Sequence, residues 1–196
     1  MKTDNNIRSY IKENEARFLD ELFSLIRIPS ISAEPAHKAD MLQCAERWRE
    51  LLIAAGVDHA EVMPSAGNPL VFAEKHVDDD APTVLVYGHY DVMPVDPLEL
   101  WLSVPFEPEV RDERIFARGA DDDKGQSFIQ LKAFEYLVRT RQLNHNVKFI
   151  FEGEEEIGSP SLNGFLQQHH DLLKCDIILV SDTSMLAADL PSLTTG

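Results

Sequence analysis

Apolar side chains near the N-terminus recur at the period of an α-helix. They fall on one face of that helix: Ile7, Ile11, Phe18, Leu22 and Leu25. Pro29 ends the helix, because proline restricts the preceding residue to extended geometry. A second amphipathic helix follows, with an apolar face formed by Met41, Ala45, Trp48 and Leu52. We predict Asp40 as its N-cap and Gly56 as its C-terminal cap.

Short apolar runs indicate β-strands after these two helices. Two strands are predicted at residues 60–63 and 70–74, joined by a turn at Gly67-Asn68-Pro69. Residues 83–87 are apolar and β-branched, which is typical of a strand buried on both faces. Further strands are predicted at residues 147–151 and 176–180.

Helices are predicted between the later strands, at about residues 124–139 and 160–173. Residues 92–113 contain four prolines and are expected to form a long loop. Strands that alternate with helices indicate an α/β fold. We therefore predict an α/β protein, a three-layer αβα sandwich around a mixed, largely parallel sheet.

Composition and charge narrow the class of protein. The 196 residues are enough for one domain, and a net charge of −16 argues against nucleic acid or an anionic membrane as partner. The first 14 residues are mostly polar and charged, without the apolar stretch of a signal peptide, and no apolar run approaches the length of a membrane span. The two cysteines, Cys44 and Cys175, are interpreted as buried and reduced. These features predict a cytoplasmic protein.

Polar residues cluster where the predicted strands end. The clusters occupy residues 88–91, 152–156 and 181–182, and a fourth acidic cluster at 121–123 precedes a predicted helix. In open α/β sheets, ligands bind outside the carboxyl ends of the strands. Four acidic or histidine-containing clusters at one end of a sheet would be suited to binding a cation.

Each cluster taken alone also has an ordinary structural interpretation. His89 and Asp91 would suit either a strand end or a metal-binding histidine oriented by a carboxylate. The three aspartates at 121–123 suit a helix N-terminus, but adjacent carboxylates repel one another unless a cation lies among them. The glutamates at 152–156 suit an exposed turn, or a metal site with a general base. Asp182 alone would be an ordinary turn cap.

Taken in order, these segments resemble one known family. The resemblance rests on YGHYDVMP at 87–94, ARGADDDKG at 117–125, EGEEEIGS at 152–159 and Ser181-Asp182, and it extends to LIRIPSIS at 25–32. These segments are similar to those of the co-catalytic zinc amidohydrolases. That family includes carnosinases, carboxypeptidase G, aminoacylase, succinyl-diaminopimelate desuccinylase and acetylornithine deacetylase. The match spans nearly the whole chain and lies nearest the carnosinase-like branch.

The resemblance implies a zinc exopeptidase-like fold and a role for six residues. His89 and Asp182 would bind one zinc ion, and Asp91 would orient His89. Asp122 would bridge two zinc ions, and Glu156 would bind the second. Glu155 would be the general base that activates water. The family often has a cis peptide after the bridging aspartate, which here is the Asp122–Asp123 bond.

The resemblance also implies the reaction and its limits. The expected activity is zinc-dependent hydrolysis of a dipeptide, with N-acyl amino acid deacylation or metal binding without catalysis as alternatives; Mn²⁺ or Co²⁺ could replace Zn²⁺. The family's lid domain, which also makes the homodimer contact, and its final histidine ligand have no counterpart in residues 1–196, which end at Thr194-Thr195-Gly196. We therefore expect the N-terminal part of a catalytic domain, with weak occupancy of the second zinc site, little activity alone and exposed apolar surface.

Overall fold

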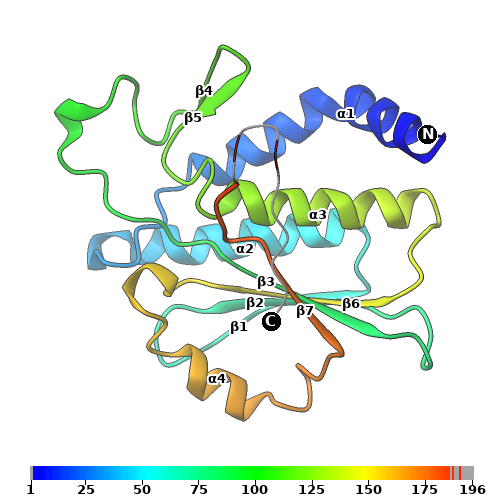
Figure 1. Ribbon diagram of the computed structural model, residues 1–196. Coiled ribbons are helices and arrows are strands. Elements are labelled where there is room, and N and C mark those ends of the chain that lie inside the picture. The colour runs from blue at the N-terminus through cyan, green and yellow to red at the C-terminus, as the bar shows by residue number, and fades with distance from the viewer. Residues whose placement is uncertain (1, 186, 188–189, 191–196) are drawn as a thin grey trace.

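A computed structural model describes residues 2–185, 187 and 190 of the chain (Figure 1). The described part is a five-stranded sheet with helices on both faces, in agreement with the predicted three-layer sandwich. The predicted end of the domain portion, at Thr194–Gly196, lies outside the described residues. No helix of the described part is both long and apolar enough to cross a membrane.

The strand order in the sheet is β1 (His59–Met63), β2 (Leu70–Lys75), β6 (Asn146–Glu152), β3 (Thr83–His89) and β7 (Ile177–Val180). The pairings β1–β2 and β2–β6 are antiparallel, whereas β6–β3 and β3–β7 are parallel. The prediction of a mixed sheet is therefore confirmed, but the sheet is less parallel than predicted: two of its four pairings are parallel, both in the β6–β3–β7 half. In that half the carboxyl ends of all three strands lie at one edge of the sheet.

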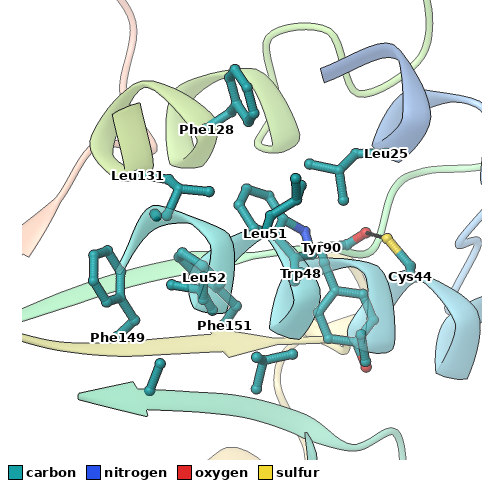
Figure 2. Close-up of a cluster of buried hydrophobic side chains, with 14 of the residues drawn as sticks. Leu25, Cys44, Trp48, Leu51, Leu52, Tyr90, Phe128, Leu131, Phe149 and Phe151 are labelled. Carbon is teal, nitrogen blue, oxygen red and sulfur yellow. Dashed lines mark hydrogen bonds between the residues drawn. The ribbon is translucent and has the colours of Figure 1, made fainter. Parts of the chain in front are cut away.

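Three helices cover one face of the sheet, and a shorter helix lies on the other (Figure 1). The first three are α1 (Lys2–Ile26), α2 (Lys38–Ala55) and α3 (Lys124–Arg139), and the fourth is α4 (Leu162–Gln168). The larger core lies under the three helices, where Trp48 of α2 packs against Phe151 of β6 with ring centroids 4.6 Å apart (Figure 2). A smaller core lies on the α4 face, around Phe72, Ile150 and Phe165.

Several predicted details are wrong. Asp40 is not the N-cap of α2: a 3-10 turn at Pro35–His37 leads into the helix, and Asp40 lies in the first helical turn, with its carboxylate 2.7 Å from Nδ1 of His37. Helix α4 is shorter than predicted, and Cys175 is half-buried rather than buried.

Gly56 caps α2 as predicted, in the left-handed conformation with φ +105°.

The loop predicted at residues 92–113 has structure of its own. It contains a 3-10 turn at Leu98–Leu100 and the strand β4 (Glu109–Arg111), which pairs with β5 (Arg114–Phe116) in a small separate hairpin. Both strands of this hairpin are too short to show an alternating pattern over several residues. The hairpin therefore escaped prediction.

Strand β7 forms an exposed edge of the sheet. Its sequence is entirely apolar, yet Ile177, Ile178 and Val180 are 50%, 63% and 46% exposed. On its inner side β7 pairs with β3, and no other described strand pairs with its outer side. The outer edge of the described sheet is therefore an exposed apolar surface.

Candidate metal centre

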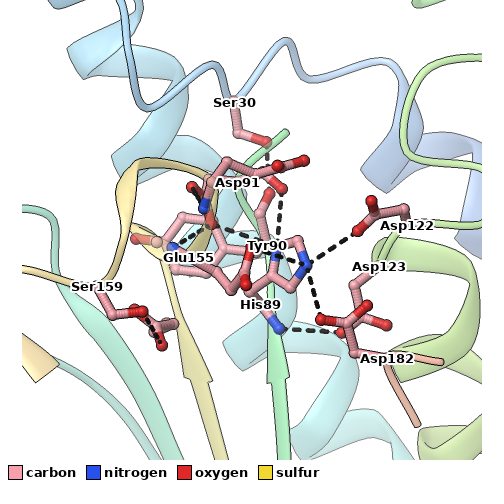
Figure 3. Close-up of polar contacts among 12 residues, drawn as sticks. Ser30, His89, Tyr90, Asp91, Asp122, Asp123, Glu155, Ser159 and Asp182 are labelled. Carbon is pink, nitrogen blue, oxygen red and sulfur yellow. Dashed lines mark hydrogen bonds and ion pairs between the residues drawn. The ribbon is translucent and has the colours of Figure 1, made fainter. Parts of the chain in front are cut away.

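The four predicted polar clusters meet at the edge where β6, β3 and β7 end. His89 is the last residue of β3 and is aligned with Glu152, the last residue of β6. Asp182 follows two residues after β7 ends, and Asp122 lies just before α3 begins. The parallel arrangement of the strands brings His89 and Asp182 to this edge, and the segment before α3 places Asp122 beside them (Figure 3).

His89 is fully buried, and its hydrogen bonds orient its ring. Nδ1 lies 3.1 Å from the backbone oxygen of Asp91 and 3.4 Å from its carboxylate. A carbonyl oxygen can only accept, so Nδ1 carries the proton and donates it. Nε2 faces Asp122 Oδ1 at 3.1 Å and Asp182 Oδ2 at 3.6 Å. A metal-binding histidine needs this orientation, with one nitrogen anchored and the other directed at the ion.

The donor atoms of His89, Asp122 and Asp182 lie within 4.8 Å of one another, which is close enough to hold a metal ion. Burial alone would lower the pKa of His89, but the surrounding carboxylates, chiefly Asp91 and then Asp123 and Asp182, raise it to about 10. The site therefore favours a positive charge at this point, which a divalent cation would supply. One imidazole nitrogen and carboxylate oxygens are a donor set that zinc and similar divalent metals accept.

The three adjacent aspartates have three different environments. Asp121 and Asp122 are both exposed, but the side chain of Asp122, which is 58% exposed, faces His89. Asp123 is buried and accepts hydrogen bonds from the His89 backbone N–H at 3.0 Å and from Ser127 Oγ at 2.6 Å. Burial raises the pKa of Asp123 to about 6. Asp122 is thus the aspartate placed at the histidine, and the Asp122–Asp123 peptide is cis, as expected.

The four glutamates at residues 152–156 divide into two pairs. Glu152 and Glu154 are buried, and Glu154 accepts backbone N–H groups of Asn68 at 2.9 Å and Ser161 at 3.1 Å. Glu155 and Glu156 are half-buried, and Glu155 Oε2 lies 3.9 Å from His89 Nε2. Of these four side chains, that of Glu155 is the one that faces His89.

Glu156 is the one predicted metal ligand outside the group of three. Its Oε1 accepts the backbone N–H of Met93 at 3.1 Å. Burial, followed by the charge of Asp122, raises the pKa of Glu156, so this carboxylate lies close enough to Asp122 to be affected by it. The structure thus places Glu156 beside the centre but engaged with the backbone.

The Asp91 carboxylate also accepts two backbone hydrogen bonds that were not predicted from the sequence. Its carboxylate accepts the backbone N–H of Glu155 on Oδ1 at 3.2 Å and that of Glu156 on Oδ2 at 3.1 Å. The H-x-D pattern suggests the contact with His89, but no local signal indicates contacts 64 and 65 residues away. Asp91 therefore joins the histidine to the acidic turn.

Lys124 and Gly125 belong to the segment singled out at 117–125, but their contacts could not be read from the sequence. The buried Lys124 ammonium donates to the backbone oxygens of Leu25 at 3.0 Å and Ile28 at 2.7 Å, which anchors the start of α3 to the end of α1. Gly125 lies against the backbone of Ala120: a Cβ at this position would lie 1.9 Å from that carbonyl oxygen. Glycine is therefore required for the tight turn that carries Asp122.

We expect Gly125→Ala to destabilise the chain, because the added methyl group displaces the backbone between Ala120 and Asp122. Overpacking of this kind costs about 1–3 kcal/mol. The matched control is Gly164→Ala in α4, where a Cβ would meet nothing within 4 Å. Urea unfolding of the two variants measures the difference, and equal midpoints would contradict the role of Gly125.

Residues 85–192 match the model of a protein family described as peptidase family M20/M25/M40. The chain belongs to this family. The region matched contains all six residues singled out from the sequence, from His89 to Asp182. The resemblance to the zinc amidohydrolases is thereby confirmed at the level of the family.

Individual members of the M20 family are similar over most of the chain. A cysteinylglycine-S-conjugate dipeptidase from Corynebacterium striatum is 32% identical over 184 residues, which cover 93% of this chain and 40% of that protein. The crystal structure of human carnosine dipeptidase 1 has a TM-score of 0.83 at 27% identity, over 91% of this chain and 41% of that one. The crystal structure of an M20 family metallo-carboxypeptidase from Sulfolobus solfataricus is 36% identical with a TM-score of 0.78, over 86% of this chain and 38% of that one. The chain thus spans about two fifths of the length of these relatives.

Proposed function

We propose that the protein is a metal-dependent dipeptidase, and that this chain supplies most of its metal centre and its general base. The observation that carries the proposal is the convergence of His89, Asp122 and Asp182, with Glu155 beside them, at the carboxyl edge of the parallel strands. The M20 family membership and the dipeptidases among the similar proteins support the same reaction class.

Each residue has a role in this proposal. His89 and Asp182 would hold one metal ion, Asp122 would lie between two ions, and Glu156 would turn from Met93 to the second. Zinc is the metal we propose, because its usual ligands include this combination of imidazole and carboxylates. Mn²⁺ or Co²⁺ would be substitutes, and a histidine from the rest of the polypeptide would complete the second site.

Hydrolysis of a peptide bond needs one group on the protein that accepts and returns a proton, and we assign this role to Glu155. When bound, the metal ions polarise the scissile carbonyl and make the attacking water more acidic. Glu155, half-buried beside His89, takes the proton from this water and later delivers it to the departing amine. Asp91 holds the backbone of Glu155 and the ring of His89 together, so that base and metal ligand keep a constant separation.

The proposal extends to the domain organisation, the substrate and the compartment. We propose that residues 1–196 are the N-terminal part of the catalytic domain, and that a lid region elsewhere in the polypeptide binds the substrate and forms a homodimer. The exposed apolar edge at β7 is where more of the same domain would pack. The substrate would be a small peptide, and the compartment the cytoplasm.

The metal centre is tested by the metal content of this chain after dialysis against zinc. We expect one tightly held zinc ion per chain, which is lost in His89→Ala and in Asp122→Ala. The control is His170→Ala, since the His170 side chain is 76% exposed and could bind metal only adventitiously. Loss of zinc in the control but not in the other two variants would contradict the proposed centre.

The reaction class is tested on the intact protein that contains this chain. Dipeptides and N-acetyl amino acids are supplied separately, and the released amine is measured with and without a chelator. Chelator-sensitive cleavage of dipeptides supports the proposal, whereas cleavage of the N-acetyl compounds alone would assign the protein to the deacylases. Zinc bound without cleavage of either class would leave a metal-binding protein that is not an enzyme.

A further inference from the structure

Glu152 is a buried carboxylate at the candidate centre that the proposed reaction does not use. It is the last residue of β6 and is 2% exposed. Its Oε1 accepts two hydroxyl groups, Tyr87 Oη at 2.5 Å and Ser159 Oγ at 2.9 Å. A buried carboxylate is unfavourable unless it is well hydrogen-bonded, so its presence calls for a structural or functional reason.

The bond from Ser159 closes the loop that presents the general base. After Glu152 the chain runs through the 3-10 turn Glu155–Ile157 and then reverses at Gly158 and Ser159, with φ values of +86° and +52°. The Ser159 hydroxyl then donates back to Glu152, the residue at which the loop began. Residues 153–158 are thus enclosed by a side-chain contact at the base of the loop.

The bond from Tyr87 connects this loop to the strand that carries His89. Tyr87 lies two residues before His89 on β3, which pairs with β6 in parallel register. Through Glu152 the Tyr87 hydroxyl, the strand end of β6 and the loop are joined in one hydrogen-bonded unit. On the other side of the turn, Asp91 accepts the N–H groups of Glu155 and Glu156. The turn is therefore held from two directions.

We propose that Glu152 is a positioning residue, which holds the hydroxyls of Tyr87 and Ser159 and thereby keeps Glu155 at its working distance from His89. This inference rests on the proposed function, because it assigns Glu155 the role of general base. An apolar residue at position 152 would leave two hydroxyls without their acceptor and release the end of the loop. Glutamine would retain an oxygen that can accept both hydroxyls.

The test compares two ways of removing these bonds with one that preserves them. Glu152→Ala and the double change Tyr87→Phe with Ser159→Ala remove the bonds, whereas Glu152→Gln keeps an acceptor. In the intact protein we expect kcat for a dipeptide to fall about tenfold to hundredfold in the first two, since small misplacements of a catalytic group have effects of this size. KM and bound zinc should stay near their wild-type values, and Glu152→Gln should retain most of the activity.

A second measurement does not depend on activity. In this chain, hydrogen exchange of the Glu155 and Glu156 amides should accelerate in Ser159→Ala, the mildest of the changes. The matched control is Ser24→Ala in α1, which removes a serine hydroxyl that donates to the Glu21 backbone oxygen and accepts from Arg47 of α2.

The possible outcomes separate the two proposals. Wild-type kcat and unchanged exchange in the variants that lack the bonds would overturn the positioning role while leaving the dipeptidase proposal intact. A fall in thermal stability with kcat unchanged would likewise reduce Glu152 to a structural residue. Absence of dipeptide cleavage by the wild-type protein would refute the proposed function, and the positioning role with it.

Discussion

Glu155→Gln is expected to lower the kcat of the intact protein about 10²- to 10⁴-fold, the range that a general base contributes. Glutamine has nearly the same shape but cannot accept a proton from water. The backbone N–H of residue 155 would still donate to Asp91, so the turn would stay in place. Bound zinc should therefore be nearly unchanged, since Glu155 is not among the three converging ligands. Steady-state kinetics and metal analysis of the same preparation measure both quantities.

The control for this variant is Glu61→Gln on β1, where the side chain is 47% exposed and lies on the opposite edge strand of the sheet. It changes the net charge by the same amount and should leave kcat unaltered. If Glu155→Gln retained wild-type activity, the assignment of the base would be wrong. If it lost zinc as well as activity, Glu155 would be a ligand rather than a base.

Leu52→Ala is expected to destabilise the chain by about 2–5 kcal/mol, which is a large part of the total stability of an ordinary domain. Leu52 is fully buried in the larger core, where α2 meets the sheet (Figure 2). Removing three carbon atoms there loses apolar contacts and leaves a cavity, because a packed core closes only in part. Urea unfolding followed by circular dichroism measures the change.

The same substitution at Leu102 provides the control. Leu102 lies between the 3-10 turn Leu98–Leu100 and β4 and is 90% exposed, so Leu102→Ala should change the stability by no more than about 0.5 kcal/mol. Equal effects at the two positions would show that Leu52 is not part of a packed core.

Much of the fold followed from the sequence because local periodicity reports which side chains are buried. Helix α3 begins and ends where predicted, at Lys124 and Arg139, since apolar residues recur on one face across its whole length. The strands that carry the centre were also predicted, because each is a compact apolar run. Elements without a long pattern were missed, as in the hairpin of β4 and β5, or were given the wrong length, as in α4.

The candidate site was predictable for a different reason. His89 is the last residue of β3, the acidic turn begins at the end of β6, and Asp182 lies two residues after β7; parallel strands end at the same edge. The choice of Asp122 over its neighbours came from the family pattern, and the structure places that aspartate at His89. The roles of these residues in binding metal and in catalysis stay predictions that the experiments above test.

The sequence by itself determined which residues are candidate metal ligands or a candidate base, and which strand ends carry them. Only the tertiary structure decided which donors each acidic residue accepts. Glu152 accepts hydroxyl groups and Glu154 accepts backbone N–H groups, whereas Asp91 accepts the backbone N–H of Glu155 in the acidic turn. The reason is physical. A run of glutamates has the same charge and local pattern at every position, whereas hydrogen-bond partners come from segments distant along the chain, such as Asn68 and Tyr87, and are set only when the strands pack together.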